Sequence, residues 1–260
     1  MGIPIVNSEQ VIVFILVFLR IGSLLIMIPV IGERTVPLRV KGGLAILVSL
    51  LVFPSVRTTI PEFQADTAVF PLSIVMIGEV LIGIVIGFAA KIIFAGIQFA
   101  GEMSGFQIGF SFVNIIDPIS STQVSIISEF EYLIALLVFL AIDAHHSFIL
   151  TIVESYRIVS PFSYHFSGSL MQHILMLSRE LFIIAIKISA PVMAVLLFTN
   201  VALGVVARTV PQINVFIVGF PLQIAAGLIV FGLTAPFFVM LVQKALTILN
   251  LEVHTLLRLM

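Results

Sequence analysis

The sequence predicts an all-α protein of several membrane-embedded helices, and three observations support this fold class. Hydrophobic residues make up 60% of the 260-residue chain and charged residues only 10%. A soluble domain carries about 25% charged residues, so this chain cannot solvate an ordinary water-exposed surface. The apolar residues are gathered in long runs, and the mean hydropathy is +1.28. We therefore expect an integral membrane protein, or a protein whose outer face is covered by partners.

The apolar runs define the expected helices. In chain order they are Val11–Ile31, Gly42–Val56, Ala68–Ala100, Val124–Ile142, Leu170–Val206 and Ile213–Asn250. A helix needs roughly 20 apolar residues to cross a ~30 Å hydrocarbon core, so the second run is short for a span. The last two runs would form helices of about 55 Å. They contain Pro191, Pro221 and Pro236, and each proline removes a helical hydrogen bond. We expect a long, proline-bent hairpin packed into a larger helical assembly.

Ionisable residues inside these runs are candidates for function, because burying a charge in hydrocarbon is costly. We single out Arg20, Glu79, Lys91, Glu180 and Lys187. Glu180 and Lys187 share a helix face two turns apart, whereas Glu79 and Lys91 do not. One interpretation is an ion or proton relay. The other, which we favour, is pairing between helices or extension of the charged group towards the interface.

Small residues recur every fourth position along the third run and beyond it. Gly83 and Gly87 form a GxxxG arrangement, and Gly101, Gly105 and Gly109 continue the spacing. Glycines at this period let helix backbones approach closely within a membrane. We expect tight packing against other helices at Gly83, Gly87 and Gly101.

The stretch GFQIGFSFVNIIDP, from Gly105 to Pro118, interrupts the helical pattern. Its residues alternate strictly between large apolar and small or polar side chains over Phe106–Phe112, which predicts extended backbone. Gly109 and the Asp117-Pro118 pair also oppose a continuous helix. Non-helical backbone at membrane depth must be buried in protein or line an aqueous cavity. We favour a stopper in a conduit over a segment lying at the bilayer interface.

No motif of an enzyme or a cofactor site stands out. The chain has no cysteine, and it lacks the HExxH, GxSxG, P-loop and GxGxxG patterns. His145 and His146 follow Asp143, but adjacent side chains on a helix point about 100° apart, so we expect no shared metal ion there. The net charge of −1, without a basic patch, argues against a nucleic-acid partner.

Three blocks of the sequence resemble the FliR family of flagellar export-gate proteins, whose injectisome counterpart is SctT. The blocks are ERTVPLRVKGGLA at Glu33–Ala45, GEMSGFQIGFSFVNIIDP at Gly101–Pro118 and RTVPQINVFIVGFPLQIAAGL at Arg208–Leu228. The resemblance implies a structural, non-enzymatic subunit of the type III protein-export channel. It would complete an export gate with P-type and Q-type subunits, at the bacterial inner membrane within the basal-body ring of the flagellum. Unfolded exported proteins would pass through the channel.

The resemblance also implies a division of the chain and two functional segments. Residues 1–169 resemble a P subunit, and residues 170–260 resemble the hairpin of a Q subunit. Residues 105–121 match the plug loop that helps to close the channel, with Gly105, Phe106, Gln107, Gly109, Phe110, Phe112, Asp117 and Pro118. A second functional segment of the family, a turn, matches Arg208, Pro211, Gln212, Asn214 and Phe216. In the family, the switch protein of the export apparatus wraps near this turn.

The chain departs from the family pattern at two places. Asp143-Ala144 stands where an Asn-Gly pair is common, and Gln223 stands where lysine is frequent.

Two other function classes stay open. A secondary transporter of small solutes or ions is the main alternative, motivated by Glu79, Lys91 and the proline-containing runs. An intramembrane enzyme is the weaker one, since no nucleophile, base or metal constellation is present.

Overall fold

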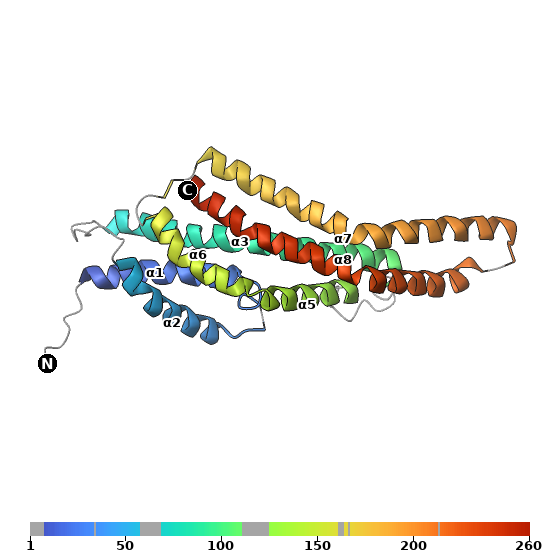
Figure 1. The fold of residues 1–260 in the computed structure, drawn as a ribbon, viewed down its shortest axis with the longest axis horizontal. Helices are drawn as coiled ribbons and strands as arrows, with labels where there is room; N and C mark the ends of the chain where they lie inside the picture. The colour runs from blue at the N-terminus through green and yellow to red at the C-terminus, as the bar shows by residue number, and fades with distance from the viewer. Residues whose placement is uncertain are drawn as a thin grey trace. The chain divides into compact units, whose positions relative to one another are not determined.

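The computed structural model describes residues 8–33, 35–57, 69–110, 125–160, 164–165, 167–212 and 214–260. Within these ranges every regular element is a helix (Figure 1). The helices are α1 (Ser8–Met27), α2 (Leu38–Arg57), α3 (Val69–Ile108), α5 (Ile126–Ala141), α6 (Ala144–Ile158), α7 (Gly168–Thr209) and α8 (Val215–Leu259). The predicted all-α fold is therefore confirmed.

Five of these helices are long and apolar enough to cross a membrane, namely α1, α2, α3, α7 and α8. Helices α5 and α6 qualify together as one broken span, which makes the number up to six. The helices α3, α7 and α8 contain 40, 42 and 45 residues. Pro191 lies inside α7, and Pro221 and Pro236 lie inside α8, so none of the three prolines ends a helix. The prediction of a multi-helix membrane protein is confirmed, while the bends at the prolines stay a prediction.

Two sequence expectations about helix bounds are wrong. Helix α6 was not expected, because the polar residues of Ala144–Ile158 dilute its hydropathy. Extended backbone was expected from Phe106, but Phe106, Gln107 and Ile108 form the last turn of α3. Ile108 is fully buried in an apolar cluster with Ile127, and this burial outweighs the local alternation.

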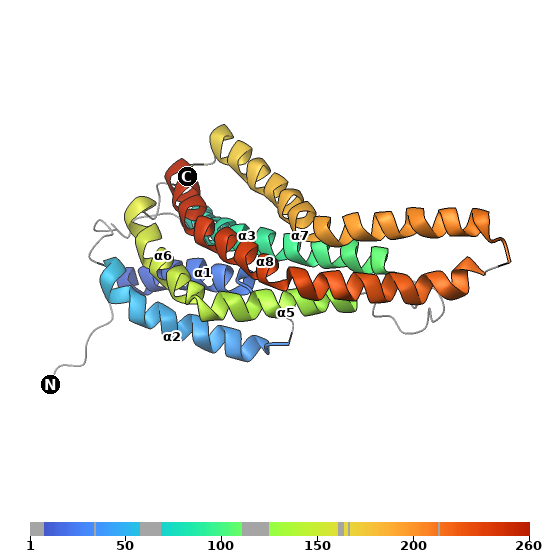
Figure 2. The same cartoon turned by 45° about the vertical axis from the view of Figure 1, so that its right-hand side comes forward.

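The helices form two compact units, and α3, α7 and α8 contribute to both. The first unit comprises residues 1–91, 143–177 and 246–260. In it, α1 and α2 lie side by side (Figure 2). Its core is apolar and includes the fully buried side chains of Leu16, Ile21, Ile82, Ile86 and Ile152.

The glycines of the GxxxG pair lie at the contact between α1 and α3 in the first unit. A Cβ atom added at Gly83 would collide with Ser23 and with the carbonyl of Arg20. One added at Gly87 would collide with the side chain of Met27. The two helices approach this closely only because both positions lack a side chain.

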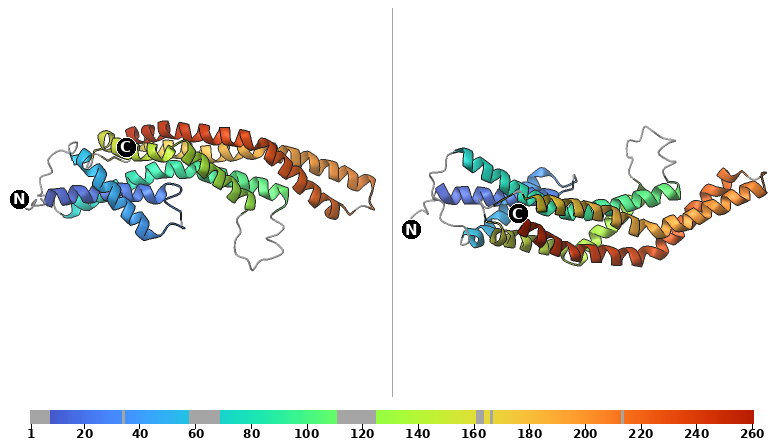
Figure 3. Two further views of the ribbon diagram at one scale, coloured as in Figure 1. Left: turned by 60° about the horizontal axis from the view of Figure 1, so that its bottom comes forward. Right: turned by 90° about the horizontal axis from the view of Figure 1, so that it is seen from above.

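The second unit comprises residues 92–142 and 178–245. Helices α7 and α8 run side by side in it and form a hairpin (Figure 3). Between them, the side-chain amide of Gln223 donates a hydrogen bond to Asn200. Close approach recurs on α3, where a Cβ at Gly101 would collide with the backbone of Ser128 on α5.

Candidate functional site

The end of α3 carries the first half of the glycine-phenylalanine stretch. Gly109 has a φ of +102°, a backbone conformation that residues with a side chain rarely adopt. Its amide donates to the carbonyl of Phe106 at 3.1 Å, and the amide of Phe110 donates to the carbonyl of Gly105 at 3.1 Å. These two bonds are those of a Schellman motif, which satisfies the last carbonyls of a helix. Gly109 therefore ends α3 and redirects the chain.

The chain leaves α3 and returns to α5 at one place in the second unit, which we call the loop base. We define the loop base as Gly105, Ile108, Gly109, Ser125 and Ile127. Ile108 and Ile127 belong to one buried cluster. A Cβ added at Gly105 would collide with the hydroxyl of Ser125. The end of α3 and the start of α5 are therefore in contact.

Helix α8 also packs against the loop base. A Cβ added at Gly227 would lie 2.6 Å from Cγ1 of Ile108, so only glycine leaves room for this isoleucine. A Cβ at Gly109 would lie 3.6 Å from the ring of Phe220. Phe106, by contrast, is 70% exposed, so its ring points away from the unit. Phe112, Asp117 and Pro118 lie outside the described residues.

The turn between α7 and α8 is exposed throughout its described part. Arg208 and Thr209 end α7, and Pro211 and Gln212 follow them as exposed turn residues. Asn214 caps α8, since its side-chain oxygen accepts from the amide of Ile217 at 3.4 Å. Phe216 lies in the first turn of α8, and its side chain is not described. The geometry leaves this turn accessible to a partner.

The five ionisable residues selected from the sequence fall into two groups. Arg20 and Glu79 are buried in the first unit, where Nε of Arg20 donates to Oε2 of Glu79 at 2.6 Å and Nη2 donates to Oε1 at 2.9 Å. Lys91, Glu180 and Lys187 are exposed, and no ion pair joins Glu180 to Lys187. Sharing a helix face did not bring this pair together.

Helix α6 completes the surroundings of Arg20. Nη1 of Arg20 donates to the hydroxyl of Ser155 at 3.1 Å, and Nη2 donates to the carbonyl of Val159 at 3.1 Å. The guanidinium also lies 3.9 Å from the centre of the Tyr156 ring. A buried arginine with a bidentate carboxylate, two further acceptors and an aromatic ring is a structural tie between α1, α3 and α6.

Sequence reasoning missed Ser155, Tyr156 and Val159, because it did not identify α6. It also missed Glu131 on α5, which is only 2% exposed. One oxygen of this carboxyl, Oε2, has no hydrogen-bond partner among the described residues. The rule that selected Glu79 also selects Glu131, since both lie inside apolar runs.

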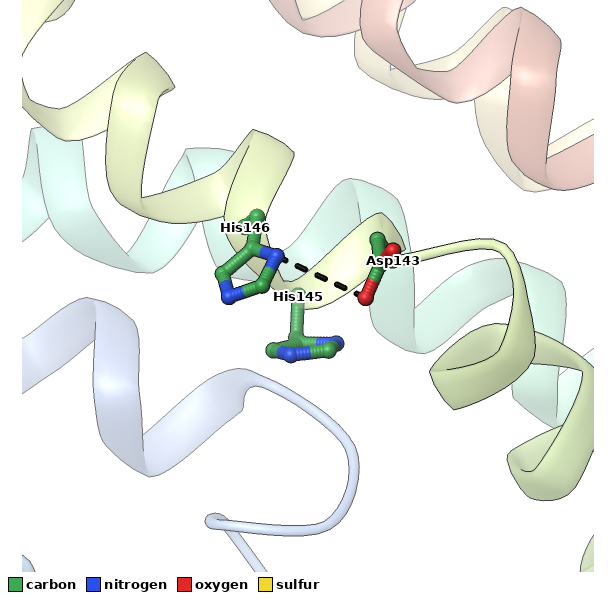
Figure 4. Close-up of side chains that lie close together, drawn as sticks. All are labelled: Asp143, His145 and His146. Carbon is green, nitrogen blue, oxygen red and sulfur yellow. Dashed lines mark ion pairs between the residues drawn. The ribbon is translucent and has the colours of Figure 1, made fainter.

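A second group of polar residues lies where α6 begins. Asp143, His145 and His146 are close together, and each offers one ligand atom within 4.8 Å of the others (Figure 4). The two rings do not diverge as expected, because their centres are 4.2 Å apart. Asp143 precedes the helix in a left-handed conformation, with φ 54°, and this turn directs its carboxylate towards His146 at 3.5 Å.

The comparisons with known proteins agree with one another. The model of the family "Bacterial export proteins, family 1" matches residues 11–248. The flagellar biosynthetic protein FliR of Bacillus subtilis (strain 168) is 37% identical over 227 residues, 83% of each chain. FliR of Pectobacterium carotovorum is 33% identical over 84% of this chain and 82% of its own. FliR of Escherichia coli (strain K12) is 30% identical over 81% of this chain and 79% of its own.

A family match across most of the chain, together with relatives at this identity and coverage, agrees with the three sequence blocks and the all-α membrane fold. The chain therefore belongs to the first family of bacterial export proteins, the family of the flagellar biosynthetic protein FliR.

Proposed function

We propose that this chain is a structural subunit of the flagellar type III protein-export channel. In this role it completes an export gate with P-type and Q-type subunits at the inner membrane, within the flagellar basal body. Residues 1–169 take the place of a P-like subunit and residues 170–260 that of a Q-like hairpin. The subunit performs no catalytic step, and unfolded proteins are its cargo.

The single observation that best supports this proposal is the length of apolar surface along α7 and α8. Exposed apolar residues run along α8 from Ile217 to Leu251, and along α7 from Leu175 to Val206. At 1.5 Å per residue these stretches measure roughly 50 Å and 46 Å along the helix. A hydrocarbon core is only ~30 Å thick. A bilayer leaves part of each stretch uncovered, which supports its coverage by protein partners.

The loop base supports a role for the segment that begins at Gly105. The Schellman turn at Gly109 and the contact of Gly105 with Ser125 hold together the described residues that precede and follow segment 111–124. A stretch whose flanking residues are held together suits a plug better than a free tail. We assign the plug role to the stretch from Gly105 to Ser121, in accord with the family resemblance. The exposed turn at Arg208 is the proposed contact of the switch protein.

The transporter alternative loses its motivation. Glu79 is engaged by Arg20 at 2.6 Å and 2.9 Å, so it is not available as an ion ligand. Lys91 is exposed, and the prolines lie inside continuous helices. A transporter with discontinuous helices needs unwound backbone at its substrate site.

Native mass spectrometry after gentle detergent extraction tests the proposal. The chain is expressed together with the other flagellar export-gate genes of its own bacterium. We expect the chain to be released in a complex with other small membrane subunits. We expect no stable monomer of the chain in the spectrum. A monomer that transports small solutes in liposomes would contradict the proposal.

A further inference from the structure

The polar group at the start of α6 has the composition of a metal site. Two imidazoles and one carboxylate, from His145, His146 and Asp143, place one ligand atom each within 4.8 Å of the other two. Figure 4 shows the three side chains gathered beside the same turn of the chain. Imidazole and carboxylate together bind divalent ions of the later transition metals, of which zinc is the commonest in proteins.

The spacing of the ligand atoms suits such an ion. Bonds of about 2.0–2.1 Å in a tetrahedron place neighbouring ligand atoms about 3.4 Å apart. Nδ1 of His146 and Oδ1 of Asp143 are already 3.5 Å apart. The remaining pairs are within 4.8 Å, so they need to close by less than about 1.5 Å. Rotation of the side chains supplies this, because those of His146 and Asp143 are 66% and 70% exposed.

The local backbone holds the three residues in this arrangement. Asp143 is in the left-handed region, which aspartate tolerates better than most residues, and its amide precedes the first turn of α6. Its carboxylate makes no capping hydrogen bond to the helix, although it stands at the N-cap position. The carboxylate is directed instead at His146, and the ring of His145 lies beside that of His146, with the centres 4.2 Å apart and the planes tilted by 39°.

We propose that Asp143, His145 and His146 form a binding site for one divalent transition-metal ion of the zinc class. The three side chains supply one carboxylate oxygen and two neutral imidazole nitrogens, and water fills the remaining positions. All three ligands lie within four residues, so the site needs no other part of the chain. The bound ion links the turn at Asp143 to the first turn of α6 and holds the start of that helix.

Metal titration of the full-length chain in detergent tests this site. The protein carries an affinity tag without histidine and is stripped with a chelator before use. Co²⁺ is added as a spectroscopic probe, and Zn²⁺ is then titrated in competition. We expect one ion per chain, and at least about tenfold weaker binding in each of Asp143→Asn, His145→Ala and His146→Ala. Asp143→Asn keeps the shape and the left-handed tolerance of the residue.

Two other histidines provide matched controls. His173 and His254 each lie close to a glutamate, Glu252 at 2.8 Å and Glu154 at 3.5 Å, outside the proposed site. His173→Ala and His254→Ala are expected to leave the metal affinity unchanged. Helix content from circular dichroism verifies that every variant folds. Absence of stoichiometric binding, or equal affinity in the site variants and the controls, would overturn the proposal.

Discussion

At the scale of single residues, the chain uses charge and backbone conformation for structure. Arg20 has no exposed surface, and Glu79, Ser155 and Val159 all accept hydrogen bonds from it. Its partners lie 59 to 139 positions away along the chain, so no spacing rule reveals them. The sequence predicted pairing between helices in preference to a relay for the intramembrane charges, and the contacts of Arg20 give that interpretation a concrete form.

Removing Arg20 alone should destabilise the first unit strongly. Arg20→Met leaves the carboxylate of Glu79 buried without its partner, which typically costs about 3–5 kcal/mol. The double variant Arg20→Met with Glu79→Leu removes both charges, and we expect it to recover much of this loss. The thermal midpoint in detergent, followed by circular dichroism, measures the effect. Equal midpoints for the single and double variants would show that the pair is not the source of the stability.

Gly109 is the second residue whose substitution we expect to lower the stability. Gly109→Ala forces a side chain into φ +102°, which costs of order 1–3 kcal/mol, and should lower the thermal midpoint. Gly204→Ala is the matched control, because Gly204 lies in α7 with open space around it. Alanine in a helix interior is favoured over glycine by up to about 1 kcal/mol, so the control should be neutral or stabilised. A stable Gly109→Ala variant would refute the Schellman turn.

At the scale of elements, the sequence predicted the apolar helices well, because hydrophobic runs report burial in lipid or protein directly. The prediction from the sequence failed where contacts between distant residues determine the secondary structure. Helix α6 carries His145, His146, Glu154 and Arg157, so it is too polar for a hydropathy scan, although it is anchored by the buried side chains of Ile152 and Tyr156. The last turn of α3 is helical, despite its alternating residues, because Ile108 packs into the second unit.

Segment 111–124, between α3 and α5, is the part of the chain whose proposed role is easiest to separate from the fold. The described residues that flank it meet at the loop base, where Gly105 contacts Ser125. Replacing segment 111–124 with a short glycine-serine linker should therefore leave the second unit folded and the gate assembled. We expect cells with this variant to become permeable to ions and small dyes, measured by dye uptake. A linker of the same length as the natural segment is the control for loop length. Permeability like that of the wild type in both variants would argue against the plug.

At the scale of the whole molecule, the apolar surface of α7 and α8 is the feature on which the proposed contacts with other subunits rest. Phe198 on α7 and Leu233 on α8 are 73% and 76% exposed. A sequence alone reports that such residues are apolar, but it cannot say which of them the chain itself covers. The predicted hairpin is present in the structure, while the identity of its neighbours comes from family membership and remains the proposal made above.

Cross-linking from the exposed face of α8 tests the central claim most directly. The chain has no cysteine, so Leu233→Cys creates a single attachment point for a maleimide that carries a photoreactive group. In assembled export gates we expect the cross-link to join this position to a neighbouring protein subunit. Leu246→Cys, at a buried position in the same helix, is the control for reagent access. Products formed with lipid alone, and none with protein, would contradict the claim that partners cover this surface.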